Sequence, residues 1–210
     1  MRIGLLAIAR STFDIEYAKE KLNQCTRFLN STNHTILGAG KLLLDESDAL
    51  VEIDNLKKQI FDFILILQVT FTDASTVLKV AREFDKPIGI WAFPEPRLGG
   101  RLRLNAFCGL NLASHSLGLH NLQFSWLYEN PETIHAIEFN KMIKIEKADR
   151  KLEAVELPLV SSKKAKLIKD KISRFRIGKI GNHPEGFDTC KFDTHKLSEL
   201  CGIKVDEIEI

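Results

Sequence analysis

The sequence has no long hydrophobic run. Its longest predominantly apolar stretch, residues 63–69, has the length of a β-strand and falls well short of the ~18–20 residues of a membrane helix. The apolar stretch after Met1 is too short for the hydrophobic region of a secretory signal. Only 12 glycines and 6 prolines occur among 210 residues, which excludes collagen-like and low-complexity chains. We therefore expect a soluble, cytoplasmic globular protein that does not interact with membranes.

The sequence also lacks a strong excess of charge of one sign. Its 30 Lys and Arg residues against 28 Asp and Glu residues give a net charge of +2, which argues against a dedicated nucleic-acid-binding protein. The basic residues 163–171 are expected to form a solvated helix face, and nucleic-acid binding through them is the less favoured alternative. The four cysteines never form a CxxC pair, so we expect reduced thiols in the core: Cys25, Cys108, Cys190 and Cys201.

Short motifs of common catalytic and nucleotide-binding sites are missing. The sequence contains no GxGxxG after a predicted strand, no Walker loop, no GxSxG and no HExxH. His183, Asp188, Cys190, Asp193 and His195 are clustered, but their spacing matches no familiar metal site, and a loop followed by a helix start explains them better. No residue of this chain is therefore predicted to be catalytic or to bind a metal.

Apolar segments of strand length alternate with amphipathic segments of helix length. The predicted strands are residues 2–9, 34–37, 61–69, 88–93 and 122–128, and the helices between them lie near 15–29, 49–60, 74–84 and 105–119. This alternation is typical of right-handed βαβ units. It predicts an α/β fold for residues 1–140, with a doubly wound parallel sheet of the flavodoxin-like order 2-1-3-4-5.

The pattern changes beyond residue 140. Residues 141–175 are rich in lysine and arginine and predict a basic helical connector. Residues 176–210 then predict a strand, a loop, a helix from Lys196 to Cys201 and a final strand. A single strand–helix–strand unit is too small to bury its own faces. Either it docks on the first domain or, as we favour, it begins a second α/β domain of a longer protein.

Polar and aromatic side chains are expected where the central strands end. Ligands of open parallel sheets bind beyond the carboxyl ends of the strands, where the strand order reverses. The predicted order places Arg10, Gln68 and Phe71 at that point, and Trp91 and Glu95 leave the neighbouring strand. This mixture suits a polyhydroxylated ligand. Strand ends facing water are polar in every α/β protein, so a purely structural role remains open.

A basic loop follows at residues 96–105. Arg97, Arg101 and Arg103 flank a Gly-Gly pair, and Asn105 precedes the next helix, whose amino end favours anionic or polar groups. Three roles stay open for these arginines: they hold a substrate, they pair with carboxylates across a subunit boundary, or they solvate a long loop.

Three segments resemble the amino-terminal region of the L-fucose/L-arabinose isomerase superfamily, in its fucose-isomerase-like branch. They are ILQVTFTDA at 66–74, KPIGIWAFPE at 86–95 and GGRLRLNAFCG at 99–109. A fourth, RIGKIGNHPEGFD at 176–188, resembles the start of that superfamily's second α/β domain. The resemblance covers nearly the whole chain, and the order of the segments is more specific than any one of them.

The resemblance implies an aldose–ketose isomerase that uses a divalent metal, usually Mn²⁺. In that superfamily the metal ligands and catalytic acids come from the carboxyl-terminal half, so none is assigned to this chain, which is expected to bind no metal and to be inactive alone. The first domain contributes to the sugar pocket of a neighbouring subunit, through an Arg at the place of Arg10 and an aromatic residue at Phe71 or Trp91. The complete protein is expected to form a homotrimer or homohexamer.

The sequence thus predicts the amino-terminal part of a sugar isomerase, contributing substrate recognition and oligomer contacts. The predicted substrate-binding residues are Arg10, Gln68, Phe71, Trp91, Glu95, Arg101 and Asn105. The alternative is a sugar- or metabolite-binding module without catalysis, or one subunit of a two-chain isomerase.

Overall fold

A computed structural model describes residues 1–38, 40–144 and 162–209. The chain divides into two compact units, Met1–Lys147 and Ala148–Ile210, which are described separately below. Part of the expected basic connector, residues 145–161, lies outside the described residues, as does residue 39.

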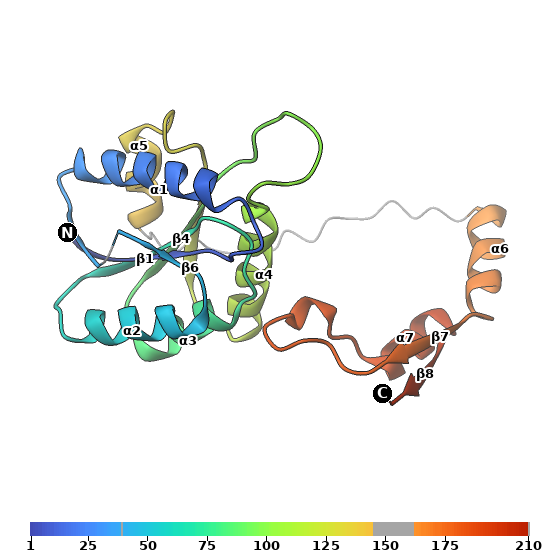
Figure 1. The fold of residues 1–210 in the computed structure, drawn as a ribbon. Helices are drawn as coiled ribbons and strands as arrows, with labels where there is room; N and C mark the ends of the chain where they lie inside the picture. The colour runs from blue at the N-terminus through green and yellow to red at the C-terminus, as the bar shows by residue number, and fades with distance from the viewer. Residues whose placement is uncertain (39, 145–161, 210) are drawn as a thin grey trace. The chain divides into compact units, whose positions relative to one another are not determined.

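The described part of the first unit is built on a six-stranded parallel sheet in which the longer strands follow the order β2-β1-β4-β5-β6 (Figure 1). The strands are β1 (Arg2–Ile8), β2 (Thr35–Leu37), β4 (Phe63–Gln68), β5 (Ile88–Ala92) and β6 (Phe124–Tyr128). A short strand that the sequence did not predict, β3 (Leu42–Leu43), pairs with the carboxyl end of β1. The predicted order 2-1-3-4-5 is confirmed, because β4, β5 and β6 are the third, fourth and fifth predicted strands.

Helices cover both faces of this sheet, as a doubly wound fold requires. Helices α1 (Ile15–Asn30) and α5 (Ala136–Ile143) lie on one face, and α2 (Glu46–Lys57) and α3 (Ser75–Glu83) lie on the other (Figure 1). Helix α4 (Ala106–Leu119) packs against α3 and β5. The eight-residue α5 was not predicted, and it extends past the domain end expected at residue 140. None of the described helices is long and apolar enough to span a membrane.

The core lies between the sheet and these helices. All six residues of β4 are buried, which explains why its sequence is almost continuously apolar. On the α1 and α5 face, the fully buried Trp91 packs edge-on against Phe28 at 5.6 Å between ring centroids and contacts Phe93 and Phe139. Edge-to-face packing of this kind stabilises the core beyond the area that it buries.

The cysteines occupy different environments, although all four are free thiols. Cys25 is buried in α1, and burial raises the pKa of its thiol well above the usual value. Cys108 and Cys190 are exposed and Cys201 is half-buried. The expectation of core thiols is therefore correct for Cys25 and wrong for the exposed pair, because apolar periodicity alone does not show which helix face a cysteine occupies.

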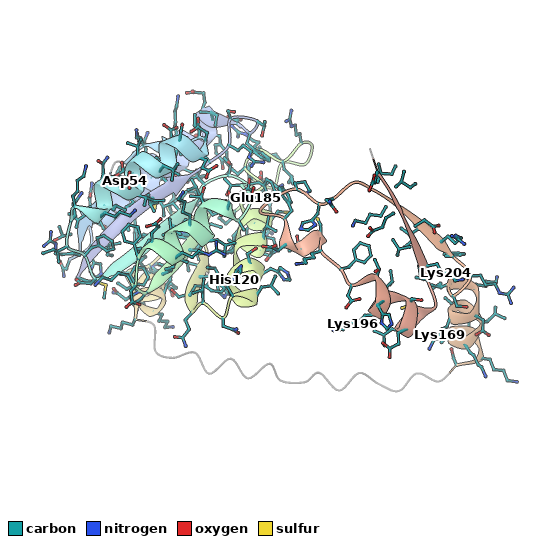
Figure 2. All side chains as sticks on the ribbon, turned by 90° about the horizontal axis from the view of Figure 1, so that it is seen from below. Asp54, His120, Lys169, Glu185, Lys196 and Lys204 are labelled. Atoms are coloured by element: carbon teal, nitrogen blue, oxygen red, sulfur yellow. The ribbon has the colours of Figure 1, made fainter. Side chains whose placement is uncertain are left out.

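The second unit contains the predicted strand–helix–strand arrangement. Its described elements are α6 (Lys163–Ile172), β7 (Arg176–Ile180), the 3-10 turn η1 (Asp188–Cys190), α7 (Thr194–Cys201) and β8 (Lys204–Ile208). Strands β7 and β8 are parallel, and α7 begins two residues before the predicted position. No side chain in residues 162–209 is fully buried, and Ile180 and Leu200 are each 68% exposed. The lysines Lys169, Lys196 and Lys204 all belong to this unit (Figure 2).

Helix α4 contains two glycines in opposite surroundings, which yields a stability prediction. A Cβ added at Gly109 would lie 2.6 Å from Nε2 of the buried Gln68, whereas one added at Gly118 meets no described atom within 4 Å. We expect Gly109→Ala to lower the free energy of unfolding by about 1–3 kcal/mol, because Gln68 must move. Gly118→Ala should raise it by up to about 1 kcal/mol, because alanine favours helices. Urea unfolding of both variants measures this, and equal effects would contradict the described packing of α4.

Candidate functional site at the carboxyl ends of the strands

Three loops meet where β1, β4 and β5 end, and they are hydrogen-bonded to one another. The backbone N–H of Arg10 donates to Oγ1 of Thr70 at 2.8 Å, joining the loop after β1 to the loop after β4. The N–H of Phe71 donates to the carbonyl of Leu104 at 2.7 Å, joining the loop after β4 to the loop after β5. We call these loops, residues 9–14, 69–75 and 93–105, the carboxyl-end rim.

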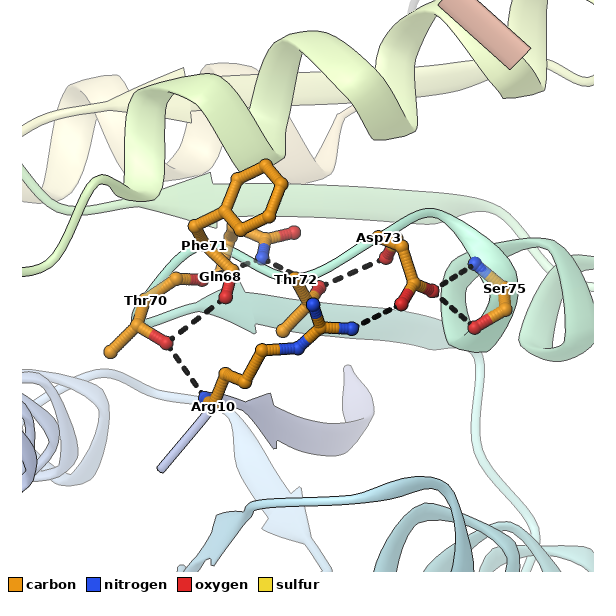
Figure 3. Close-up of polar contacts among 7 residues, drawn as sticks. All are labelled: Arg10, Gln68, Thr70, Phe71, Thr72, Asp73 and Ser75. Atoms are coloured by element: carbon orange, nitrogen blue, oxygen red, sulfur yellow. Dashed lines mark hydrogen bonds and ion pairs between the residues drawn. The ribbon is translucent and has the colours of Figure 1, made fainter. Parts of the chain in front are cut away.

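Gln68 fixes the middle loop from below (Figure 3). It is the last residue of β4 and is fully buried. Its Nε2 donates to the carbonyl of Thr70 at 2.7 Å and to Oγ1 of Thr72 at 2.9 Å. Its Oε1 is buried and has no hydrogen-bond partner among the described residues. Gln68 therefore shapes the turn that carries Phe71 and Asp73, and it lies beneath the rim surface.

The Arg10 side chain reaches across the gap between β1 and β4 to Asp73 (Figure 3). Its Nη2 donates to Oδ2 of Asp73. The other carboxylate oxygen of Asp73 accepts from the N–H of Ser75 at 3.0 Å and from the Ser75 hydroxyl, so Asp73 also holds the start of α3. The Arg10 side chain is 39% exposed and that of Asp73 is 18% exposed. The guanidinium is thus held in place but remains accessible.

A pocket of about 280 Å³ opens beside this ion pair, and we call it the acidic pocket. Its walls come from the ends of β1 and β3 and from the starts of α2 and α3. Arg10 is the cationic residue in its lining, against Asp45, Glu46 and Asp73. The formal charge of the lining is therefore −2.

The loop after β5 is wrapped around a carboxylate. Glu95 accepts backbone N–H groups from Arg103 at 3.0 Å, from Leu104 at 2.6 Å and from Asn105. Asn105 has φ of 51°, a left-handed conformation that asparagine tolerates better than most residues, and α4 begins directly after it. Glu95 and Asn105 therefore hold this loop in shape.

Arg103 ties the same loop to the start of α1. Its Nε lies 2.9 Å from Oδ2 of Asp14, and its guanidinium stacks 3.8 Å from the centroid of the Tyr17 ring. Asp14 also caps α1 by accepting from the N–H of Tyr17. That backbone hydrogen bond, followed by the bond from Arg103, holds the pKa of the Asp14 carboxyl below its usual value.

A second pocket of about 280 Å³ lies against this tie, and we call it the basic pocket. It is lined by Thr12, Phe13, Asp14, Arg101, Leu102 and Arg103. Arg101 is exposed, and its Nη2 donates to the carbonyl of Thr12 at 3.2 Å. The formal charge of this lining is +1.

The two aromatic candidates occupy different places. Phe71 is half-buried on the rim, with its ring centroid 6.2 Å from that of Phe13. Trp91 lies within β5, is fully buried, and donates from Nε1 to the carbonyl of Glu129 at 2.9 Å. Phe71, rather than Trp91, is therefore the aromatic residue that the structure places at the rim.

The structure thus places Arg10, Phe71, Glu95, Arg101 and Asn105 on the three loops of the rim, with Arg10 and Arg101 lining different pockets. Gln68 and Trp91 are buried beneath the rim and in the core. The sequence did not predict that Asp45 and Glu46 line the acidic pocket. It also did not predict that Asp73 pairs with Arg10 and Asp14 with Arg103. A helix start could have been predicted there from the Asp–x–x–Asp pattern at Asp45 and Asp48, which directly follows three apolar residues. Among the described residues, no three His, Cys, Asp or Glu side chains converge as a metal site would require.

The fold and the rim define an α/β domain with a polar, partly aromatic candidate site at the reversal of strand order. Residues 4–145 match the family described as the fucose/sulfoquinovose isomerase N-terminal domain. The match covers more than half of the chain, so the chain belongs to this family. The resemblance to the fucose-isomerase-like superfamily is thereby confirmed.

Curated relatives extend the similarity to the second unit. The chain is 26% identical over 203 residues to the sulfoquinovose isomerase of Priestia aryabhattai, covering 97% of this chain and 41% of that protein. It is 26% identical over 205 residues to the sulfoquinovose isomerase of Alkalicoccus urumqiensis, covering 98% and 42%. It is 23% identical over 210 residues to the sulfoquinovose isomerase of Clostridium sp. (strain MSTE9), covering 99% of this chain and 42% of that protein. The chain spans about two fifths of the length of these relatives.

The lowered pKa of Asp14 leads to a pH-dependent stability prediction. A carboxyl whose pKa is lower in the folded state stabilises the fold above its unfolded pKa of about 3.9. This stabilisation is lost as the pH falls through the lowered folded pKa. We expect Asp14→Asn to be less stable than the wild type near neutral pH, and the difference to vanish in acid below the folded pKa. Asparagine also caps helices well, so the difference reports the charge.

Urea unfolding at a series of pH values measures this difference. Asp85→Asn removes the same charge from an exposed position and serves as the control. A difference that persists unchanged in acid would contradict the role assigned to the Asp14 carboxylate.

Proposed function

We propose that this chain is the substrate-recognition part of a sugar isomerase that interconverts aldoses and ketoses. The family match supports this assignment. The observation that carries it is the accessible guanidinium of Arg10, which Asp73 holds in place at the reversal of strand order. Phe71 lies in the same loop as Asp73. The fucose-isomerase-like resemblance implies an arginine and an aromatic residue in these roles.

The rim has the chemistry that a sugar requires. The Arg10 guanidinium has N–H groups besides the one bound to Asp73, and these are available to sugar hydroxyls. The face of Phe71 can cover the C–H side of a sugar ring, while the carboxylate of Asp73 can accept a hydrogen bond from a sugar hydroxyl. Because backbone hydrogen bonds fix the loops, a sugar meets these groups already in position, which lowers the entropic cost of binding.

The proposal places the chemical step outside the described residues. In such isomerases a divalent metal such as Mn²⁺ would supply Lewis-acid chemistry, and carboxylates would act as general acid and base. The described residues do not bring together a ligand set that fits this metal. The rim residues of this chain therefore bind and orient the sugar, and we assign them no proton transfer.

We also propose that the second unit begins another α/β domain. Its strand–helix–strand arrangement leaves Phe175, Ile180 and Leu200 at least 60% exposed, and further strands and helices would cover them. The similarity to longer relatives across this unit supports the proposal. We also propose that the complete protein forms a homotrimer or homohexamer, to whose contacts this chain contributes.

The relatives' names indicate a substrate class. Three of the similar proteins are sulfoquinovose isomerases, and sulfoquinovose is a sugar that carries a sulfonate group. We propose that the complete protein isomerises an aldose of this kind.

The test compares sulfonated and unsulfonated aldoses as substrates of the full product of the gene that carries this sequence, with Mn²⁺ present. The absence of any aldose–ketose turnover would contradict the proposal and favour a binding module.

Replacing Arg10 should weaken sugar binding without a comparable effect on metal binding. In the full gene product we expect Arg10→Ala to raise KM for the sugar by about tenfold or more, because hydrogen bonds from a charged group are lost. The affinity for Mn²⁺ should change far less. Steady-state kinetics and a manganese titration measure the two effects, and Arg27→Ala, an exposed arginine on α1, is the control. Unchanged sugar kinetics would contradict the site, and Mn²⁺-dependent turnover by residues 1–210 alone would contradict the placement of the chemical step elsewhere.

A further inference from the structure

The two pockets of the carboxyl-end rim have opposite electrostatic character. The lining of the acidic pocket carries −2 and that of the basic pocket carries +1. Both are lined by the loop after β1, which contributes Arg10 to the first and Thr12, Phe13 and Asp14 to the second. A ligand with one neutral end and one charged end would meet different environments at its two ends.

We infer that the basic pocket binds an anionic substituent of the sugar, with Arg101 as its principal ligand, and that Arg10 binds the neutral hydroxyl end. The inference rests on the proposed function, and it assigns to Arg101 the selectivity of the site for charged sugars. The substituent is a tetrahedral oxyanion, either a sulfonate or a phosphate.

Arg10 is poorly placed to select an anion. Its guanidinium is bonded to Asp73, and Asp45 and Glu46 add two further negative charges to the same pocket. The helix amino ends there are also occupied, because Asp45 accepts from the N–H of Asp48 at 2.9 Å and Asp73 from that of Ser75. An oxyanion at Arg10 would therefore approach three carboxylates, two of which already accept an N–H at a helix start.

Arg101 has the opposite properties. Its hydrogen bond goes to a neutral carbonyl, and no carboxylate of the described residues forms an ion pair with it. The neighbouring Arg103 forms an ion pair with Asp14, which offsets the charge of Arg103. The exposed Arg97 lies in the same loop and adds positive charge. The guanidinium of Arg101 is therefore an unmatched cation beside a pocket.

Two glycines directly precede Arg101 in the loop after β5. Gly99 and Gly100 both have positive φ, 73° and 78°, and a Cβ at either would meet no described atom within 4 Å. The space next to these two positions is therefore open. A planar guanidinium in such a position can present two N–H groups to two oxygens of a sulfonate or phosphate.

The test measures binding to the whole 210-residue chain by following backbone amide NMR signals. The ligands are sulfoquinovose, glucose 6-phosphate and glucose, which differ in whether one carbon carries a sulfonate, a phosphate or a hydroxyl. We expect the charged sugars to shift the amides of residues 12–14 and 101–103 saturably and to bind about tenfold tighter than glucose. Added salt should reduce this advantage.

Substitutions identify the residue responsible. Arg101→Gln should weaken binding of the charged sugars about tenfold and leave glucose unchanged, whereas Arg101→Lys should retain part of the advantage. Lys58→Gln removes one positive charge at the carboxyl end of α2 and is the matched control. A preference for sulfoquinovose identifies the substituent as a sulfonate, and a preference for glucose 6-phosphate identifies it as a phosphate. Either preference supports the anion site.

Two results would overturn the inference. One is that the charged sugars shift residues 45–46 and 72–76 and are weakened by Arg10→Gln but not by Arg101→Gln. The other is that the charged sugars bind no tighter than glucose, including the case in which no sugar binds to the chain. The proposed function is decided separately, by aldose–ketose turnover of the full gene product, so the two can fail independently.

Discussion

The reversal of strand order between β1 and β4 is the constraint on which the candidate site depends. Parallel strands side by side normally send their connections over one face, but here α1 follows β1 on one face and α3 follows β4 on the other (Figure 1). The two loops diverge and leave a gap at the edge of the sheet. The hydrogen bond from the N–H of Arg10 to the Thr70 hydroxyl spans that gap and fixes its width. The buried Gln68 holds Thr70 from below, so the gap is shaped from inside the core.

The charge pattern of the rim follows from how the helices are capped. Asp14, Asp45 and Asp73 each accept a backbone N–H in the first turn of a helix, and all three helices begin at this edge of the sheet. A doubly wound fold thus brings several carboxylates to its ligand edge for structural reasons alone. Arg10 and Arg103 offset two of them. Positive charge without a carboxylate partner lies on the loop after β5, because Arg101 donates to the neutral carbonyl of Thr12, whereas Arg103 pairs with Asp14 and Glu95 accepts backbone N–H groups of the loop.

The sequence predicted the fold more completely than the site. The strand order followed from elements with strong patterns, such as the fully buried six-residue β4, which is apolar except for Gln68. Strand β3 has two residues, too few for a periodic pattern to be visible. Helix α5 was not predicted, although it has eight residues, as α7 does. The second unit's arrangement was also predicted, since strand β7, helix α7 and strand β8 each have a local pattern.

The predicted site residues were selected by their position after a strand, and that criterion does not show where a side chain points. Gln68 and Trp91 satisfy it, yet both are fully buried, because each faces a helix that covers the sheet at that point. The partners of the rim arginines were not predicted, since the pair of Arg103 and Asp14 is separated by 89 residues and forms only after the loops have converged. Contacts between loops of this kind depend on the tertiary fold and have no local sequence signal.

The rim combines a fixed part with an adaptable part, and the contacts explain the division. Arg10 is held through its backbone by Thr70 and through its side chain by Asp73, so its guanidinium loses little freedom when a ligand binds. Arg101 has a single bond to a carbonyl and sits beside two glycines in an open loop. The fixed group suits hydroxyls, whose hydrogen bonds require defined directions. The adaptable group suits a tetrahedral anion, because charge attraction tolerates variation in geometry and the anion itself can order the loop.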